Sequence, residues 1–216
     1  IMTEMVVTAI IKPDFLNLDL TDSGRRKKNI GNMKYISILN EELVPAMGCT
    51  EPIAIAFAAA KARQVLGTMP EKMVARCSGN IIKNVKSVIV PNTGGLHGLE
   101  AAAAAGIIAG DAEKELLVIS EVSEAEQSRI ADYLKQACFT IKESSENPLF
   151  DIKITLKSGT ESAACRIAGD HTNVVSIERH GEILYQKPAQ QKDDILDGKE
   201  LLSVESIVQF ASELQI

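Results

Sequence analysis

The feature that most limits the fold of this chain is a change in the spacing of its apolar residues near residue 115. Before this point apolar residues recur three or four apart, which predicts helices. After it they alternate, as in FDIKITLK at residues 150–157, where Ile152, Ile154 and Leu156 share one face of a strand. The change predicts an α+β fold, in which an Ala-rich helical segment precedes an antiparallel sheet-plus-helix subdomain.

The first part of the pattern predicts four helices, at residues 36–47, 51–66, 80–89 and 99–109. Thr50 is the expected N-cap of the second helix and Gly67 its expected C-cap. The fourth helix is almost entirely alanine, so it has no bulky face of its own. We therefore expect it to be buried, in close approach to its neighbours.

The second part of the pattern predicts five strands and two helices. A capping box formed by Ser123 and Glu126 predicts a helix that ends near Ala137, and the final helix is expected at residues 203–214. The strands are expected at residues 116–119, 138–142, 150–157, 161–167 and 174–179.

These elements divide the chain into four expected segments. Residues 1–32 are expected to be an N-terminal extension upstream of a natural start at Met33, or else a genuine arm that packs on the domain. Residues 33–110 form the helical, catalytic-type segment, and residues 111–187 form the α+β subdomain. Residues 188–216 are expected to be a linker and a final helix.

Composition limits the possible partners and the compartment. The chain has 216 residues, of which 45% are hydrophobic, so it can fill a core. Its net charge of −6 and its aromatic content of 4% argue against a nucleic-acid partner. No apolar stretch approaches the roughly 18 residues of a membrane span, which argues against a membrane. Without such a stretch or a signal-peptide cleavage pattern, the protein is expected to be cytoplasmic. The four cysteines form no C-x-x-C pair, and in that reducing compartment they are expected to be free thiols.

The segment PAMGCTEP, at residues 45–52, places one of these thiols between two predicted helices. Cys49 directly precedes a helix N-terminus, where unpaired N–H groups and the helix dipole favour a thiolate. This is a position for a reactive or metal-binding cysteine. The alternative is a small buried residue that fills a tight turn.

Two further segments carry candidate binding residues. In CSGNIIKNVKSVIVPNTGG, at residues 77–95, polar side chains open one helix and a glycine-rich turn precedes another, so both could present N–H groups to a small carboxylate. Helix capping explains Ser78 and Asn80 equally well. Lys83 lacks the phosphate-binding glycine run that a pyridoxal phosphate site requires. In AGDHTNVVSIERHG, at residues 168–181, His171 is either a site residue or a structural histidine.

Three blocks together resemble the bacterial and archaeal proteins related to the catalytic subunit of iron-sulfur L-serine dehydratases, whose relatives include L-cysteine desulfidase. The blocks are VPAMGCTEPIAIAFAAAKA, SGNIIKNVKSVIVPNTG and AGDHTNVVSIERHG. The resemblance implies a lyase that performs β-elimination on L-cysteine or L-serine without pyridoxal phosphate, giving pyruvate and ammonia. It implies that Cys49 is the proton acceptor or lies at a [4Fe-4S] cluster. It also implies the substrate-pocket candidates Thr50, Asn80, Lys83, Asn84, Thr93, His171 and Asn173.

The cysteines depart from that resemblance. Members of the family continue through a second helical stretch that carries the cluster cysteines, whereas this chain has no cysteine after Cys165. We therefore expect the N-terminal half of such an enzyme, with the cluster present only in the complete protein. The expected partners are a small amino-acid substrate and either further copies of the chain or the missing half. The alternative is a non-catalytic module that binds or senses an amino acid.

Overall fold

The structure is a computed structural model, and it describes residues 34–39, 45–144, 149–187 and 202–213. The chain divides into two compact units, one of which is Pro45–Gln191 and the other Ile1–Val44 with Lys192–Ile216. Helices and a six-stranded sheet together confirm the α+β prediction. The predicted N-terminal segment at residues 1–32 and most of the predicted linker lie outside the described residues.

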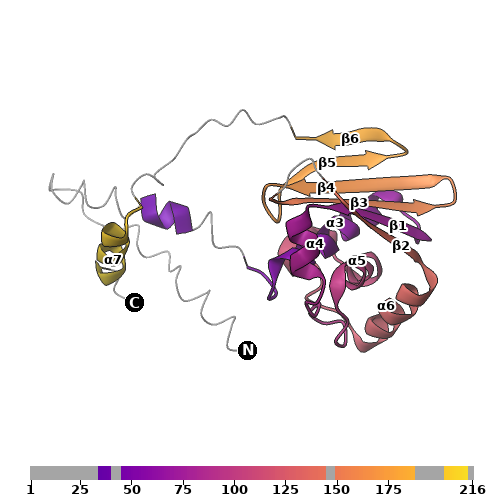
Figure 1. The fold of residues 1–216 in the computed structure, drawn as a ribbon, viewed down its shortest axis with the longest axis horizontal. Helices are drawn as coiled ribbons and strands as arrows, with labels where there is room; N and C mark the ends of the chain where they lie inside the picture. Colours follow the sequence, from indigo (N-terminus) through magenta and orange to yellow (C-terminus); the bar gives the residue numbers. More distant parts are fainter. Residues whose placement is uncertain (1–33, 40–44, 145–148, 188–201, 214–216) are drawn as a thin grey trace. The chain divides into compact units, whose positions relative to one another are not determined.

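The larger unit, Pro45–Gln191, holds the sheet and most of the helices (Figure 1). Its helices are α3 (Thr50–Leu66), α4 (Gly79–Val85), α5 (Gly98–Ala109), the 3-10 helix η2 (Ala112–Leu117) and α6 (Glu124–Gln136). Its strands are β1 (Lys72–Cys77), β2 (Cys138–Glu143), β3 (Asp151–Ser158), β4 (Glu161–Ala168), β5 (Val174–Arg179) and β6 (Glu182–Gln186).

The sheet has the strand order β2-β1-β3-β4-β5-β6. Strands β1 and β2 are parallel, and every other neighbouring pair is antiparallel. On β3 the side chains of Ile152, Ile154 and Leu156 are completely buried, as their alternation predicts. The helices lie on one side of the sheet, which Figure 1 shows, so these residues face them.

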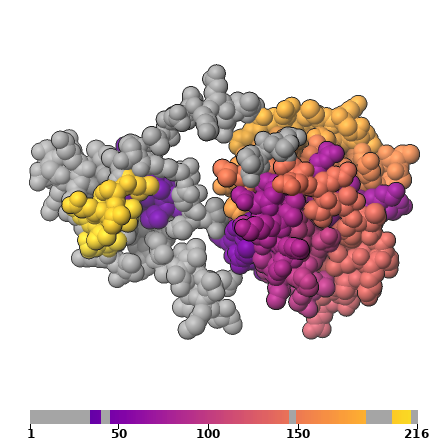
Figure 2. All heavy atoms as spheres, viewed as in Figure 1, coloured from indigo at the N-terminus to yellow at the C-terminus, as the bar shows by residue number. Residues whose placement is uncertain are grey.

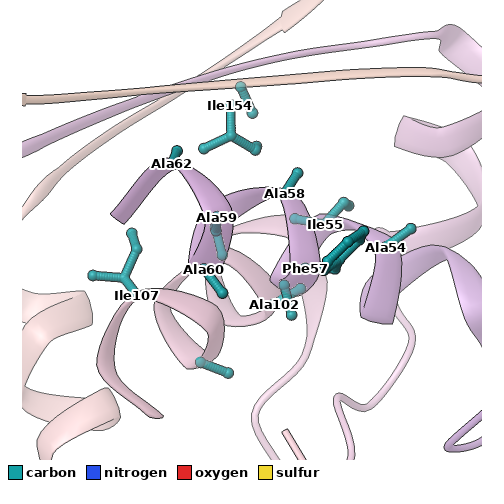
Figure 3. Close-up of a cluster of buried hydrophobic side chains, with 14 of the residues drawn as sticks. Ala54, Ile55, Phe57, Ala58, Ala59, Ala60, Ala62, Ala102, Ile107 and Ile154 are labelled. Atoms are coloured by element: carbon teal, nitrogen blue, oxygen red, sulfur yellow. The ribbon is translucent and has the colours of Figure 1, made fainter. Parts of the chain in front are cut away.

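Helix α3 is the centre of the core, between the sheet and helix α5 (Figure 3). Its residues from Pro52 to Ala60 are all buried, so the helix has no solvent-facing side over that stretch. A helix that is apolar all round must be covered all round. The small side chains let α5 and the sheet approach it closely, as the composition of both helices predicts.

The closest approach between α3 and α5 occurs at Gly106. A Cβ atom built at this glycine would overlap the backbone of Ala56. The two helix backbones are therefore in direct contact, and no side chain larger than hydrogen fits there.

Four sequence predictions need correction. The prediction of an all-helical segment over residues 34–110 is wrong at β1, which joins the sheet between β2 and β3. Residues 116–119 form part of η2 and a turn, not a strand, because Leu116, Val118 and Ile119 enter the core from that turn. The third helix ends at Val85 instead of residue 89. The edge strand β6 was not predicted.

The other boundaries lie close to the predictions. Helix α3 begins one residue early, at Thr50, and Gly67 ends it in the left-handed conformation. The capping box of α6 is present in both directions between Ser123 and Glu126. Residues 45–49 are irregular, so the first predicted helix does not extend to Met47.

Strands β5 and β6 lie on the outside of the larger unit, in orange in the space-filling view (Figure 2). Three apolar side chains of β6 are exposed, those of Ile183, Leu184 and Tyr185.

In the smaller unit, residues 34–39 are helical and the ring of Tyr35 stacks on Phe210 of α7 (Val204–Glu213), with 4.8 Å between centroids. Among the described helices, none has both the length and the apolar character needed to cross a membrane.

Candidate functional site

The candidate site lies at the N-terminal end of α3. Gly48 has a φ of 75°, which favours glycine, and it turns the chain so that Cys49 becomes the N-cap residue of the helix. A Cβ atom at Gly48 would lie 3.8 Å from the ring of Pro91, so the turn that begins the PNTGG segment is a neighbour of this end of α3. Five residues that share hydrogen bonds here form what we call the Cys49 cluster: Cys49, Thr50, Glu51, Asn84 and His171.

The first pair in the cluster joins a thiol to a carboxylate. The Sγ atom of Cys49 donates a hydrogen bond to Oε2 of Glu51 over 3.0 Å. Asn84, from helix α4, donates to the other carboxylate oxygen, Oε1, over 3.4 Å. Helix α4 therefore supplies an amide to the same carboxylate that holds the thiol.

This pairing sets the resting charges. Desolvation raises the pKa of Cys49 although the side chain is exposed at the surface, and the hydrogen bond and negative charge of Glu51 raise it further. The hydrogen bond from Cys49 lowers the pKa of Glu51. At neutral pH the pair is a protonated thiol beside a charged carboxylate. The raised pKa is opposite in direction to the predicted thiolate at the helix end, because desolvation, and after it the hydrogen bond and charge of Glu51, favour the protonated thiol.

The second pair joins Thr50 to His171, which is 121 positions later in the chain. The Oγ1 atom of Thr50 lies 3.0 Å from Nε2 of His171, and the tautomer of the ring determines which atom donates. The ring of Phe150 lies against the imidazole, with 4.5 Å between centroids, and so holds its orientation. His171 comes from the turn between β4 and β5, and the fold of the sheet is what brings it to α3.

That turn is held by its own hydrogen bonds. Asn173 donates from Nδ2 to the Ala168 carbonyl over 2.7 Å and accepts from Nζ of Lys187 over 2.6 Å. Asp170 accepts from the backbone N–H of Thr172 over 3.2 Å. Asn173 therefore fixes the position of His171, and its side chain is occupied in doing so.

The structure brings together four of the residues predicted from the sequence: Cys49, Thr50, Asn84 and His171. Asn80 and Lys83 are exposed on α4, and their role in binding stays a prediction. Thr93 is buried, and its hydroxyl donates to the Val90 carbonyl over 2.8 Å, which closes the turn. Glu51 was missed. Its signal was present in the sequence, since an acid two residues after a cysteine at a helix start can reach the thiol.

The cysteines do not fit an iron-sulfur cluster within the described part of the chain. No group of three His, Cys, Asp or Glu side chains among the described residues is placed to hold a metal ion. Cys77 and Cys165 are buried in the core, where burial raises the pKa of each thiol to about 12. Cys138 is exposed on β2, at the edge of the sheet. The [4Fe-4S] cluster of a complete protein stays a prediction, and no chemical step is assigned to it.

The chain is similar to proteins named UPF0597, and no protein-family model matches it. UPF0597 protein DSY1109 of Desulfitobacterium hafniense (strain Y51) is 51% identical over 183 residues, which are 84% of this chain and 43% of the relative. A UPF0597 protein of Treponema denticola is 41% identical over 185 residues, 85% of this chain and 43% of the relative. The chain thus spans less than half the length of these relatives.

These comparisons correct the family resemblance drawn from the sequence. The relatives carry the UPF0597 name, as does the protein of Lachnoclostridium phytofermentans that is 43% identical over 183 residues. None of these names refers to L-serine dehydratase or L-cysteine desulfidase, and the printed name states no reaction. The identification with the iron-sulfur dehydratases is therefore wrong, and any function has to be argued from the geometry of the Cys49 cluster.

Proposed function

We propose that this chain contributes the thiol-bearing part of the active site of a lyase that performs β-elimination on a small amino acid. The observation that carries the proposal is the placement of two proton-carrying pairs side by side on consecutive residues. Cys49 is paired with Glu51, and Thr50 is paired with His171. Elimination needs one group that removes the α-proton and a second group that protonates the leaving group.

The reaction begins when a base removes the proton from Cα of L-serine or L-cysteine. The electron pair forms a Cα–Cβ double bond, and the bond from Cβ to oxygen or sulfur breaks. The departing hydroxide or hydrosulfide takes a proton from the second group. The resulting enamine becomes an imine, and water hydrolyses it to pyruvate and ammonia. Cys49 is the proposed base, and His171, whose Nε2 atom lies 3.0 Å from the hydroxyl of Thr50, is the proposed proton donor.

An amino-acid substrate would bring a positive charge close to the Cys49 thiol. The ammonium group of an amino acid is attracted to the charged carboxylate of Glu51 and would compete for the oxygen that Cys49 now occupies. A positive charge at that point favours the thiolate, because an opposite charge within about 4–6 Å lowers a thiol pKa. The thiol proton then passes to bulk water before the sulfur accepts the proton from Cα. In the proposal the substrate therefore activates its own base.

The alternative is a non-catalytic module that binds or senses an amino acid. The resting Cys49 thiol is protonated, which favours this non-catalytic alternative. An ammonium-binding site needs only the Glu51 carboxylate and the Asn84 amide. This alternative predicts binding of L-serine and L-alanine with equal affinity, since neither hydroxyl nor thiol would be recognised.

The compartment and the assembly also remain proposals. We place the activity in the cytoplasm, because the described cysteines are all free thiols, as a reducing compartment keeps them. We expect the working site to be completed by further copies of the chain or by the part of the relatives that this chain does not span.

Backbone amide NMR during titration with L-serine, L-cysteine and L-alanine tests the proposal, combined with an assay for pyruvate. The proposal expects the resonances of residues 49–51 to shift with L-serine and L-cysteine, and expects Cys49→Ala to abolish any pyruvate that forms. Cys138→Ala is the matched control, because that thiol is exposed and lies outside the cluster. If neither amino acid moves those resonances, the proposal is wrong for this chain.

A further inference from the structure

The outer face of the sheet is the face on the side opposite helix α3. Side chains on β1 alternate between buried residues, such as Met73 and Ala75, and outward ones, and those on β3 do the same. The outward side chains of β1 to β4 include Lys72, Val74, Arg76, Thr140, Lys142, Lys153, Thr155, Lys157, Ala164 and Arg166. Within the unit Pro45–Gln191, the helices pack against the opposite face of the sheet (Figure 1).

Basic residues on the outer face lie in two rows that cross the strands. In the first row Lys142 is opposite Arg76, Arg76 is opposite Lys153, and Lys153 is opposite Arg166. In the second row Lys72 is opposite Lys157. The chain as a whole carries a net charge of −6, whereas basic residues are concentrated on this face.

Such rows oppose the stability of the sheet, because like charges directly across a strand pair repel. Two members of the first row are neutralised: Lys153 pairs with Glu178 at 2.7 Å, and Arg166 pairs with the buried Asp151 at 2.8 Å. Four members are exposed, and no acidic side chain in the described part of the chain forms an ion pair with them. These four are Lys72, Arg76, Lys142 and Lys157. Their charge is free for an external partner.

The distance between the two rows is close to the diameter of a helix. The rows are four residues apart along β1, which corresponds to about 13 Å at about 3.3 Å per residue. A helix with its side chains is about 10–12 Å wide. The row between them holds small or short side chains: Thr140 is opposite Val74, Val74 is opposite Thr155, and Thr155 is opposite Ala164. From β2 to β4 this row, which we call the Val74 strip, is uncharged and partly apolar; Ala164 in it is buried, and the next residue across, on β5, is Glu178, whose carboxylate pairs with Lys153.

We propose that the outer face binds an acidic amphipathic helix of a protein partner, whose apolar stripe lies on the Val74 strip and whose acidic flanks meet the two basic rows. We infer the type of partner from the charge pattern of the outer face. A nucleic acid is disfavoured, because the outward side chains of β1 to β4 include no aromatic residue on which a base could stack. The short central row also matches an apolar helix stripe better than a continuous row of phosphates.

The test uses the full chain and a synthetic 18-residue peptide that forms a helix with a leucine and alanine stripe between two rows of glutamates. Binding is followed by fluorescence anisotropy at low and high salt. The expected result is saturable binding that weakens as salt rises, since the contacts are exposed charges. Arg76→Gln with Lys142→Gln should weaken binding about fivefold, and Lys72→Gln with Lys157→Gln about equally, at the usual strength of exposed charge pairs.

The matched control is Lys86→Gln with Lys135→Gln, which removes the same charge from two exposed residues off the outer face: Lys86 follows α4, and Lys135 lies in α6, where it pairs with Asp132. This variant should bind like the wild type. Three results would overturn the proposal. They are no binding of the peptide, equal weakening by the control variant, or tighter binding through Arg76 and Lys142 to duplex DNA or to phosphatidylserine vesicles than to the peptide.

Discussion

The body of helix α3 and its N-terminal end are surrounded differently. From Pro52 to Ala60 every side chain is buried, and neighbouring backbones approach as closely as the small residues allow. At residues 49–51 the side chains are polar, partly exposed, and hydrogen-bonded to one another or to distant segments. One helix therefore combines a closely packed body with a polar, hydrogen-bonded end, and substitutions in the two regions should affect different properties.

The largest expected effect on stability is in the body of the helix. Phe57 is 2% exposed and is one of the largest side chains in the core (Figure 3). We expect Phe57→Ala to lower the free energy of unfolding by about 3–5 kcal/mol, because the cavity cannot be filled by neighbouring alanines. Urea denaturation measures it. A loss below about 1 kcal/mol would show that this part of the core is not closely packed.

A smaller loss is expected at the contact between α3 and α5. Helix propensity alone predicts that Gly106→Ala raises the free energy of unfolding by about 1 kcal/mol. We expect a net decrease of about 1–3 kcal/mol instead, because the added carbon overlaps the Ala56 backbone. The same denaturation experiment distinguishes the signs, and a stabilised variant would mean that the helices are not in backbone contact.

The comparison also shows what the sequence could and could not predict. Helix α3 was predictable because its signals are local: Pro52 in the first turn and Gly67 in the left-handed conformation at its end. Strand β1 was missed because KMVARC is short and mixes charged with apolar residues, and its pairing partners come from residues 138–158. Residues 116–119 are apolar because they enter the core from a turn, which periodicity alone does not distinguish from a strand.

The candidate site was predictable in its members but not in its pairing. Cys49 and His171 each have a local pattern that marks them as candidates. The contact between His171 and Thr50, the residue after Cys49, depends on the position of the β4–β5 turn at the start of α3, and that is a tertiary property. The pKa of the Cys49 thiol is raised, opposite to the direction that the helix end alone predicts, because desolvation of the side chain and the carboxylate of Glu51 both favour the protonated form.

At the N-terminal end we expect almost no change in stability and a clear change in reactivity. Glu51→Gln removes the negative charge that raises the pKa of Cys49, so that pKa should fall and the thiolate fraction at pH 8 should rise. Alkylation of Cys49 by iodoacetamide should then be several-fold faster than in the wild type at pH 8. The two rates should converge at high pH, where both thiols are ionised. Equal rates at pH 8 would show that Glu51 does not control the thiol.

The most direct test of the central claim is the exchange of the α-proton of L-serine with solvent deuterium, followed by proton NMR in the presence of the full chain. This step needs only the base, so it does not depend on how the leaving group is protonated. We expect the Cα–H signal to be lost with the wild type and with Cys138→Ala, and to persist with Cys49→Ala. Exchange that continues at the wild-type rate in Cys49→Ala, or no exchange with any of the three proteins, would contradict it.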